Sequence, residues 1–423
     1  MSITERFFHE RQKPEISPLA HIVEGRINAG RQISFKEYMD IALYGGIDKE
    51  GIFIPGFYSG NSVTIGDNDR QIDAGKADFI TSPECSPLFG FCIAKQVLEM
   101  WELMDKPEDF TIVEMGAGNG TLAHDILYGL KYLDRGTSDS IRYLIVENSP
   151  TLIAKQRQKL KDLPVNFVQQ SAVEFNHEIT GVFLSNELVD ALPTHIVRRC
   201  KKGWEELYIG KGGAQIFAED WKVPEAMVLD SFDSYAPEVN IGSMIPINLN
   251  GRKWMENMAK SLRRGYIITF DYEIEDRKIP LRAFSAEDKG FKKRYHAYRD
   301  KQHLGEFDIT SDVDFQPLAN IGEKNGLVVL GDVTQGGFLQ GTEFHKLRDE
   351  LSLLNDLAIT GGRGIDFMRT GRLLQKSSGM RVLIQGKDID EDQVLLGVKN
   401  VYHDLETEKR FKPLSQGTPV LGR

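Results

Sequence analysis

The chain has 423 residues, of which 41% are hydrophobic, 27% charged and 9% aromatic. This composition is typical of a folded globular protein and excludes collagen-like, low-complexity and disordered chains. Lys and Arg number 52 against 62 Asp and Glu, giving a net charge of −10. We expect no nucleic acid partner, because binding many phosphates requires a basic surface.

Three cysteines, Cys85, Cys92 and Cys200, lack the spacing of metal ligands, so we expect neither a disulfide scaffold nor a metal site. No stretch approaches the roughly 18 uncharged apolar residues of a membrane-spanning helix. The start, MSITERFFHERQK, has neither the apolar core of a signal peptide nor the composition of a transit peptide. These features predict a cytoplasmic protein without a membrane span.

Residues 1–100 are predicted to form an N-terminal helical and lid region. Apolar side chains recur at helical spacing in residues 34–45, and a second amphipathic helix is expected from Leu88 to Met104, after a helix start at Ser82 and Pro83. Residues 45–75 are rich in glycine and include GIFIPGFYSG. We expect a long loop or short hairpins there, and loops of this length are often functional lids.

From residue 110, short apolar runs alternate with helical segments. Strands are expected at residues 110–115, 142–147, 165–170, 181–187 and 266–272, and later at 327–332 and 380–387. Near-continuous apolar strands alternating with helices are typical of a doubly wound, mostly parallel α/β sheet. We therefore expect one core over residues 101–387 and a C-terminal extension over 388–423.

Two insertions interrupt this core, at about residues 195–250 and 275–310. The first begins with a predicted antiparallel meander at 195–221, in which GKGG forms a turn. The second is charged with little periodicity and is expected to be a covering loop. Neither insertion is expected to have a hydrophobic core of its own.

A glycine motif, VEMGAGNG at residues 113–120, lies between the first strand and a helix that begins near Thr121. Gly116, Gly118 and Gly120 have the form of a turn that binds a phosphate or a nucleoside. No lysine follows the glycines, which excludes a P-loop. Glu114 in the strand would place a carboxylate beside this turn.

Glu147 ends the second strand, where an acid can accept hydrogen bonds from both hydroxyls of a ribose. Dinucleotide enzymes also carry an acid there. Glu114, however, opposes a pyrophosphate and suits a cation, so the pair favours S-adenosylmethionine (SAM), which has a sulfonium and no phosphate. A dinucleotide and a purely structural glycine turn stay open.

Polar residues also follow the third and fourth strands. Gln170 and Ser171 would face an adenine, or are ordinary polar residues at a strand end. Asn186 and Glu187 end an apolar strand, where burial is costly without hydrogen bonds. Glu187 can hold a cationic substrate or act as a base. Asp190 and His195 follow; Asp190 is a further acid or a helix cap, and His195 a proton acceptor or a structural histidine.

The motifs, taken together, resemble the MidA family of SAM-dependent methyltransferases, which includes arginine methyltransferases of mitochondrial complex I assembly and is similar to polyketide-type methyltransferase domains. The resemblance covers most of residues 33–340 and is carried by ADFITSPECSPLFG, VEMGAGNGTLAHDIL, FLSNELVDALPTH, GYIITFDY, EFDITSDVDF and VTQGGFL. It implies a class I methyltransferase fold with SAM as the cofactor. The chain departs from the family at Ala117 and Asn119, where Pro and Arg are usual.

Carried over by motif, the resemblance implies a cofactor pocket and a substrate side. The implied cofactor residues are Thr81, Ser82, Glu84, Glu114, Gly116, Gly118 and Glu147, and the implied substrate residues are Asn186, Glu187 and Asp190.

We expect methyl transfer to a protein side chain, an arginine nitrogen by resemblance. If the acceptor is an arginine, Glu187, alone or with Asp190, would bind the nitrogens of its guanidinium. Two alternatives stay open: an O- or C-methyltransferase of small or carrier-bound acyl molecules, in which His195 or Glu187 removes a proton, and a SAM-binding scaffold without turnover. The partner is accordingly a protein substrate or a small-molecule acceptor, and the oligomeric state is left open between a monomer and a homodimer.

Overall fold

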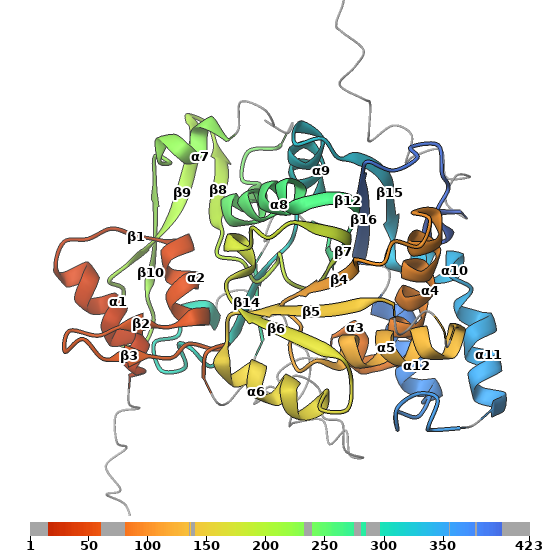
Figure 1. Ribbon diagram of the computed structural model, residues 1–423. Helices are drawn as coiled ribbons and strands as arrows, with labels where there is room; N and C mark the ends of the chain where they lie inside the picture. The colour runs from red at the N-terminus through yellow and green to blue at the C-terminus, as the bar shows by residue number, and fades with distance from the viewer. Residues whose placement is uncertain are drawn as a thin grey trace, which may run out of the picture.

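The computed structural model describes residues 16–60, 81–134, 136, 140–231, 239–274, 281–284, 297–354, 356–376 and 379–399. At its centre lies a seven-stranded sheet in the order β15-β16-β12-β7-β4-β5-β6 (Figure 1). The five strands from β6 to β12 pair in parallel, and β16 lies antiparallel between β12 and β15. The strands are β4 (Phe110–Met115), β5 (Arg142–Glu147), β6 (Val165–Gln169), β7 (Ile179–Asn186), β12 (Leu262–Tyr272), β15 (Val328–Thr334) and β16 (Met380–Lys387).

Both faces of this sheet are buried, which explains why its strands are almost continuously apolar. Successive side chains point to opposite faces, so Val182 and Leu184 of β7 belong to one core and Phe183 to the other. The first core is covered by helices α4 and α5 with α10 and α11, and the second by α8 and α9. These helices are α4 (Leu88–Leu103), α5 (Thr121–Leu133), α8 (Leu249–Ser261), α9 (Phe315–Lys324), α10 (Gln335–Gly341) and α11 (Phe344–Leu354). The predicted α/β fold with a mostly parallel sheet is confirmed.

The smaller elements around the sheet complete the fold. Helix α3 (Ser82–Cys85) precedes α4, helix α6 (Pro150–Lys159) follows β5, and helix α12 (Phe367–Lys376) packs on α3. The 3-10 turns are η3 (Ala172–Glu174), η4 (Ala297–Arg299) and η5 (Leu396–Val398), and two small antiparallel ribbons are β2 (Gly46–Ile47) with β3 (Phe53–Ile54) and β13 (Leu281–Phe284) with β14 (Asp308–Ser311). Within the described residues, none of the helices is both long and apolar enough to traverse a bilayer.

A second, antiparallel sheet is built from the first insertion and the N-terminal region. Its order is β1-β9-β8-β11, and β10 pairs with β9 (Figure 1). The predicted meander forms β8 to β10, and the GKGG sequence lies at the end of β9 and in the connection of residues 211–217 to β10. Strand β1 was not expected from the sequence. The strands are β1 (Ile33–Ser34), β8 (His195–Cys200), β9 (Gly203–Gly210), β10 (Ala218–Lys222) and β11 (Met244–Ile247). The short helix α7 (Ala226–Asp230) lies between β10 and β11, and helix α8 follows β11.

Both insertions share a hydrophobic cluster with the N-terminal region, rather than each having a domain-like core of its own. Helices α1 (Pro18–Asn28) and α2 (Phe35–Tyr44) pack against the second sheet and against residues 298–309. Phe35 and Tyr38 of α2, Phe217 of the first insertion and Tyr298 of the second are buried together. Three segments distant in sequence thus form one hydrophobic cluster. Of the predicted lid and tail, residues 61–80 and 400–423 lie outside the described residues.

Candidate functional site

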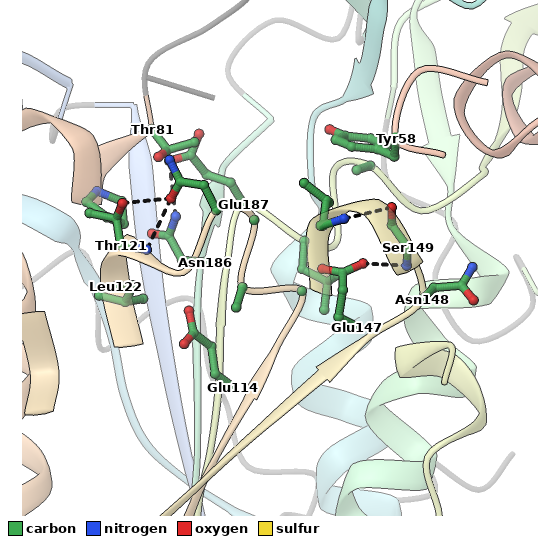
Figure 2. A pocket seen from close by; sticks show the side chains of 18 of the residues that line it. Tyr58, Thr81, Glu114, Thr121, Leu122, Glu147, Asn148, Ser149, Asn186 and Glu187 are labelled. Atoms are coloured by element: carbon green, nitrogen blue, oxygen red, sulfur yellow. Dashed lines mark hydrogen bonds between the residues drawn. The ribbon is translucent and has the colours of Figure 1, made fainter. Parts of the chain in front are cut away.

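A cavity of about 400 Å³ opens at the carboxyl edge of β4, β5 and β7 (Figure 2). Ligands of open α/β sheets bind at this edge, so the cavity is the candidate site. Most of its walls come from the sheet edge and α3, and one wall comes from the N-terminal region. The residues that line the cavity include Tyr44, Phe53, Tyr58, Thr81, Glu84, Glu114, Gly116, Gly118, Leu122, Glu147, Asn148, Asn186 and Glu187.

The glycine loop forms the floor of the cavity. Gly116 and Gly118 have φ values of +71° and +54°, in the left-handed region that favours glycine. A Cβ on Gly116 would also lie only 2.9 Å from Leu188 Cδ1. The backbone N–H of Gly116 donates to Val146 O (2.9 Å), and Gly118 O accepts from Gln156 Nε2 (2.8 Å). The loop therefore bends tightly at the sheet edge and leaves room above it.

Two buried carboxylates flank the loop. Glu114 Oε2 accepts from the Tyr143 hydroxyl (2.7 Å), and Glu147 Oε1 accepts from Ser149 N (2.9 Å). Burial raises the pKa of Glu114 to about 7 against the lowering effect of the Tyr143 hydrogen bond, and the charge of Glu147 adds to the rise. Burial likewise raises the pKa of Glu147 to about 7, although hydrogen bonds from Ser149 and Gln156 oppose it.

These two carboxylates fit SAM on chemical grounds. A positive ligand would favour their ionised forms and offset the cost of burying them. Glu147 lies at the strand end where an acid binds ribose hydroxyls, and Glu114 lies beside the cavity where the sulfonium and amino groups need a negative partner.

The turn after β7 supplies the third carboxylate. Glu187 has a φ of +52°, unusual for a residue with a side chain. Its Oε1 accepts from Ser82 N (3.0 Å) and from Asn186 Nδ2 (3.2 Å). Asn186 Oδ1 is buried without a hydrogen-bond partner among the described residues. Such an orphaned acceptor at a cavity wall is suited to a donor on a ligand.

Helix α3 contributes the opposite wall. Thr81 and Glu84 line the cavity, as the sequence predicts. Ser82 is different: its hydroxyl points away, toward Gln335 Oε1 (3.1 Å), and only its backbone N–H reaches the site, through Glu187. Ser82 therefore does not line the cavity, although the resemblance places it at the cofactor pocket, and only its backbone N–H bonds to a residue that does.

Four other predicted residues lie outside this cavity. The imidazole Nδ1 of His195 lies 2.6 Å from Glu206 Oε1, and both side chains are buried where β8 pairs with β9. This pairing makes His195 structural, so its predicted role as a base is not supported. Asp190 is buried in the turn after β7 and does not line the cavity.

Gln170 donates to Glu174 O (2.8 Å) beyond β6. Ser171 lines a neighbouring cavity of about 310 Å³, which shares Tyr44, Glu147 and Asn148 with the first. Neither side chain therefore lines the main cavity.

Sequence reasoning missed the aromatic wall. Tyr44 and Tyr58 stack with ring centroids 5.9 Å apart. The Tyr44 hydroxyl donates to Ala191 O (3.1 Å) and the Tyr58 hydroxyl to Asp308 Oδ1 (2.8 Å). The one signal in the sequence was the three aromatic residues of GIFIPGFYSG, which include Tyr58 but not Tyr44. Nothing in that segment indicates that it reaches a sheet edge formed more than fifty residues later.

Comparison with known proteins identifies the family. Residues 92–333, more than half of the chain, match the family described as "Putative S-adenosyl-L-methionine-dependent methyltransferase". The chain belongs to this methyltransferase family. The family resemblance, the enzyme class and SAM as cofactor, all expected from the motifs, are confirmed.

Relatives of this methyltransferase carry a more specific name. It is 28% identical over 300 residues to the mitochondrial protein arginine methyltransferase NDUFAF7 homolog of Drosophila melanogaster, covering 64% of the chain and 66% of the relative, just under two thirds. It is 26% identical to the Xenopus tropicalis protein of that name, covering 79% and 77%. The prediction of a cytoplasmic location is wrong, since these relatives are named mitochondrial; it relied on the absence of leader features from a few residues.

A solved structure has the same fold as this methyltransferase. The protein, from Burkholderia thailandensis and bound to S-adenosyl-homocysteine, superposes with a TM-score of 0.70 at 23% identity, covering 90% of this chain and 94% of that one. Because nine tenths of the chain is covered, the agreement extends beyond the central sheet.

Proposed function

We propose that this methyltransferase transfers the methyl group of SAM to a guanidinium nitrogen of an arginine in a protein substrate. The observation that carries this proposal is the charge of the cavity: among the described residues that line it, four are glutamates and none is Lys, Arg or His. Such a wall favours a cationic acceptor beside a cationic cofactor. The names of the relatives favour the same acceptor over an acyl molecule or a scaffold without turnover.

The proposed roles follow from the positions of the acids. Glu114 and Glu147 hold the cofactor side, together with Gly116, Gly118, Thr81 and Glu84. Glu187 accepts two N–H groups of the guanidinium in the manner of paired carboxylates and guanidinia, and Asn186 Oδ1 accepts a further N–H.

SAM, when bound, supplies an electrophilic methyl group. In the transfer one N–C bond forms as one S–C bond breaks, and the guanidinium loses one proton. The protein must align the acceptor nitrogen with the methyl carbon and exclude water. Glu187 fixes the orientation of the acceptor and its negative charge favours proton loss from the nitrogen, while the stacked Tyr44 and Tyr58 close one side of the cavity.

The test uses SAM with a labelled methyl group, the purified full chain and a mitochondrial extract, followed by hydrolysis and separation of amino acids. We expect label in methylated arginine. Glu187→Gln keeps an oxygen that can accept from Ser82 N, so SAM affinity should stay nearly unchanged while transfer falls by about 100-fold or more. Label only in small acyl products, or full transfer by Glu187→Gln, would contradict the proposal.

A further inference from the structure

The turn that presents Glu187 is held by the end of a neighbouring strand. Residue 187 lies in the left-handed region, which costs a residue with a Cβ about 1 kcal/mol or more and persists only when the surroundings impose it. One constraint is the bond from Glu187 N to Phe270 O (2.9 Å) of β12. This bond fixes the start of the turn but not the residues that follow.

The second constraint is Asp271, the next residue of β12. Its Oδ2 accepts from Val189 N (2.8 Å) and from Asp190 N (3.3 Å), and its Oδ1 accepts from Tyr272 N (2.8 Å). The carboxylate is completely buried. It thus connects three backbone N–H groups, two of which belong to the turn.

The charge of Glu187 also acts on Asp271. Burial raises the pKa of Asp271 to about 7, the N–H of Tyr272 opposes this rise, and the negative charge of Glu187 increases it. Burying a carboxylate under the influence of another negative charge is costly. The three N–H groups from which Asp271 accepts offset this cost, and two of them fix the geometry of the turn.

We infer that Asp271 is a positioning residue, which holds the 187–190 turn so that the Glu187 carboxylate stays opposite Ser82 and oriented toward the acceptor. The inference relies on the proposed role of Glu187. Asp271 is not among the residues that line the cavity. Its effect on catalysis is exerted through the backbone of Val189 and Asp190.

Asp271→Asn provides the sharpest test, because it keeps the shape but replaces one acceptor oxygen with an amide that itself donates. We expect kcat for methyl transfer to fall by about tenfold or more, with the Kd for SAM within about twofold of the wild-type value. Hydrogen exchange should quicken in a peptide that contains Val189 and Asp190 and stay unchanged in β4 and β5.

Asp314→Asn is the matched control. Asp314 caps α9 by accepting from Gln316 N (3.3 Å), and it does not line the cavity. Asparagine caps helices about as well as aspartate, so we expect little change in stability and no fall in kcat in this variant. If Asp271→Asn does not fold, Asp271→Glu retains the charge on a longer side chain and should show the same local exchange with a smaller fall in kcat.

The inference is overturned if wild-type kcat and wild-type exchange at residues 187–190 persist in the folded variant. It is also overturned if exchange rises throughout the central sheet while the loss of activity equals the unfolded fraction. Failure of the proposed function gives a different result: the wild-type protein itself would then transfer no methyl group to arginine, and the exchange measurement would still test how the turn is held.

Discussion

At the scale of single residues, three of the four glutamates of the cavity, Glu114, Glu147 and Glu187, are held in different ways. Glu187 accepts from a backbone N–H of α3 and from Asn186, whereas Glu147 accepts from the N–H at the start of α6 and from Gln156 Nε2 (3.3 Å). Glu114 is fixed by a single phenol, Tyr143. Because their partners differ, each acid can be neutralised without displacing the others.

Glu147→Gln should weaken SAM binding by about tenfold or more, or ~1.4 kcal/mol. The glutamine oxygen can still accept from Ser149 N, so the change removes the charge and one acceptor for the ribose rather than the fold. Calorimetric titration with SAM measures it. Glu102→Gln, on an exposed part of α4, is the control and should bind as the wild type does. An unchanged Kd in Glu147→Gln would refute the assignment of this residue.

The raised pKa values predict that SAM affinity depends on pH. Glu114 and Glu147 are half protonated near pH 7 without a ligand, and a cation binds their ionised forms. Affinity should therefore rise as pH increases from about 6 to 7.5. Calorimetry in two buffers of different ionisation enthalpy should detect proton release on binding, and Glu114→Gln should reduce it. No release at about pH 6.5 would count against this electrostatic account.

The raised pKa values of Glu114 and Glu147 also predict how the free energy of unfolding changes with pH. The unfolded chain loses these two protons near pH 4.5, whereas the folded protein keeps them to about pH 7. Between these values the folded state binds more protons, so the contribution of these groups to the free energy of unfolding falls as pH rises. SAM should offset this loss most strongly above pH 7.

At the scale of elements, helix α3 is four residues long and depends on its neighbours. Besides the Ser82 bond to Gln335, Pro83 O accepts from Arg363 Nη2 (2.9 Å), and Arg363 also forms an ion pair with the buried Asp125 of α5. Ser86, after the helix, bonds to Thr370 of α12. Segments from the last quarter of the described chain thus hold the wall that carries Thr81 and Glu84.

Arg363→Ala should lower both stability and SAM affinity. It leaves the Asp125 carboxylate buried without this partner, which costs about 3 kcal/mol, and it frees Pro83 O. Urea unfolding and SAM titration measure the two effects. Adding Asp125→Asn to the variant should restore part of the stability but not the SAM affinity, since α3 still lacks the hydrogen bond from Arg363 to Pro83 O. Recovery of both would show that α3 needs no such support.

The elements differ in how far the sequence predicts them. The strands β4, β5 and β16 were predicted at their observed bounds, because a strand buried on both faces leaves a continuous apolar run. The cavity residues in the glycine loop and at the strand ends could be predicted because ligands of open α/β sheets bind at the carboxyl ends of the strands. Strand β1 has two residues and no periodicity.

Other features of the site could not be predicted, because they depend on how segments of the chain pair in space. The aromatic wall and the backbone role of Ser82 depend on contacts between segments that are distant in the sequence. Ser82 and Glu187, for example, are 105 positions apart. The Glu206 partner of His195, 11 positions away, depends instead on how β8 and β9 pair.

At the scale of the whole molecule, the cavity lies between parts with separate cores. The central sheet and its helices provide the glutamates and the glycine loop, whereas the cluster of α1, α2 and both insertions provides Tyr44 and supports Tyr58 through Asp308. In Figure 1 this cluster lies to the left of the central sheet. The boundaries of the methyltransferase core at residues 100 and 387, expected from the sequence, stay a prediction.

Phe35→Ala tests whether the three segments fold as one. Phe35, the first residue of α2, is fully buried and its ring packs against that of Tyr298. Its replacement should therefore lower the free energy of unfolding by about 3–5 kcal/mol. Hydrogen exchange should quicken together in residues 16–60, 195–222 and 297–311, while the glycine loop stays protected and SAM still binds. Faster exchange confined to α2 would show that the segments are independent.

The shared core also constrains how acceptor specificity can change. A relative's N-terminal segment placed alone on this chain would meet insertions whose side chains do not complement it, and the cluster around Phe35, Tyr38, Phe217 and Tyr298 would not close. Exchanged together, the three segments carry their packing with them. Acceptor preference should therefore be inherited, and engineered, as a three-part module on an unchanged cofactor-binding sheet.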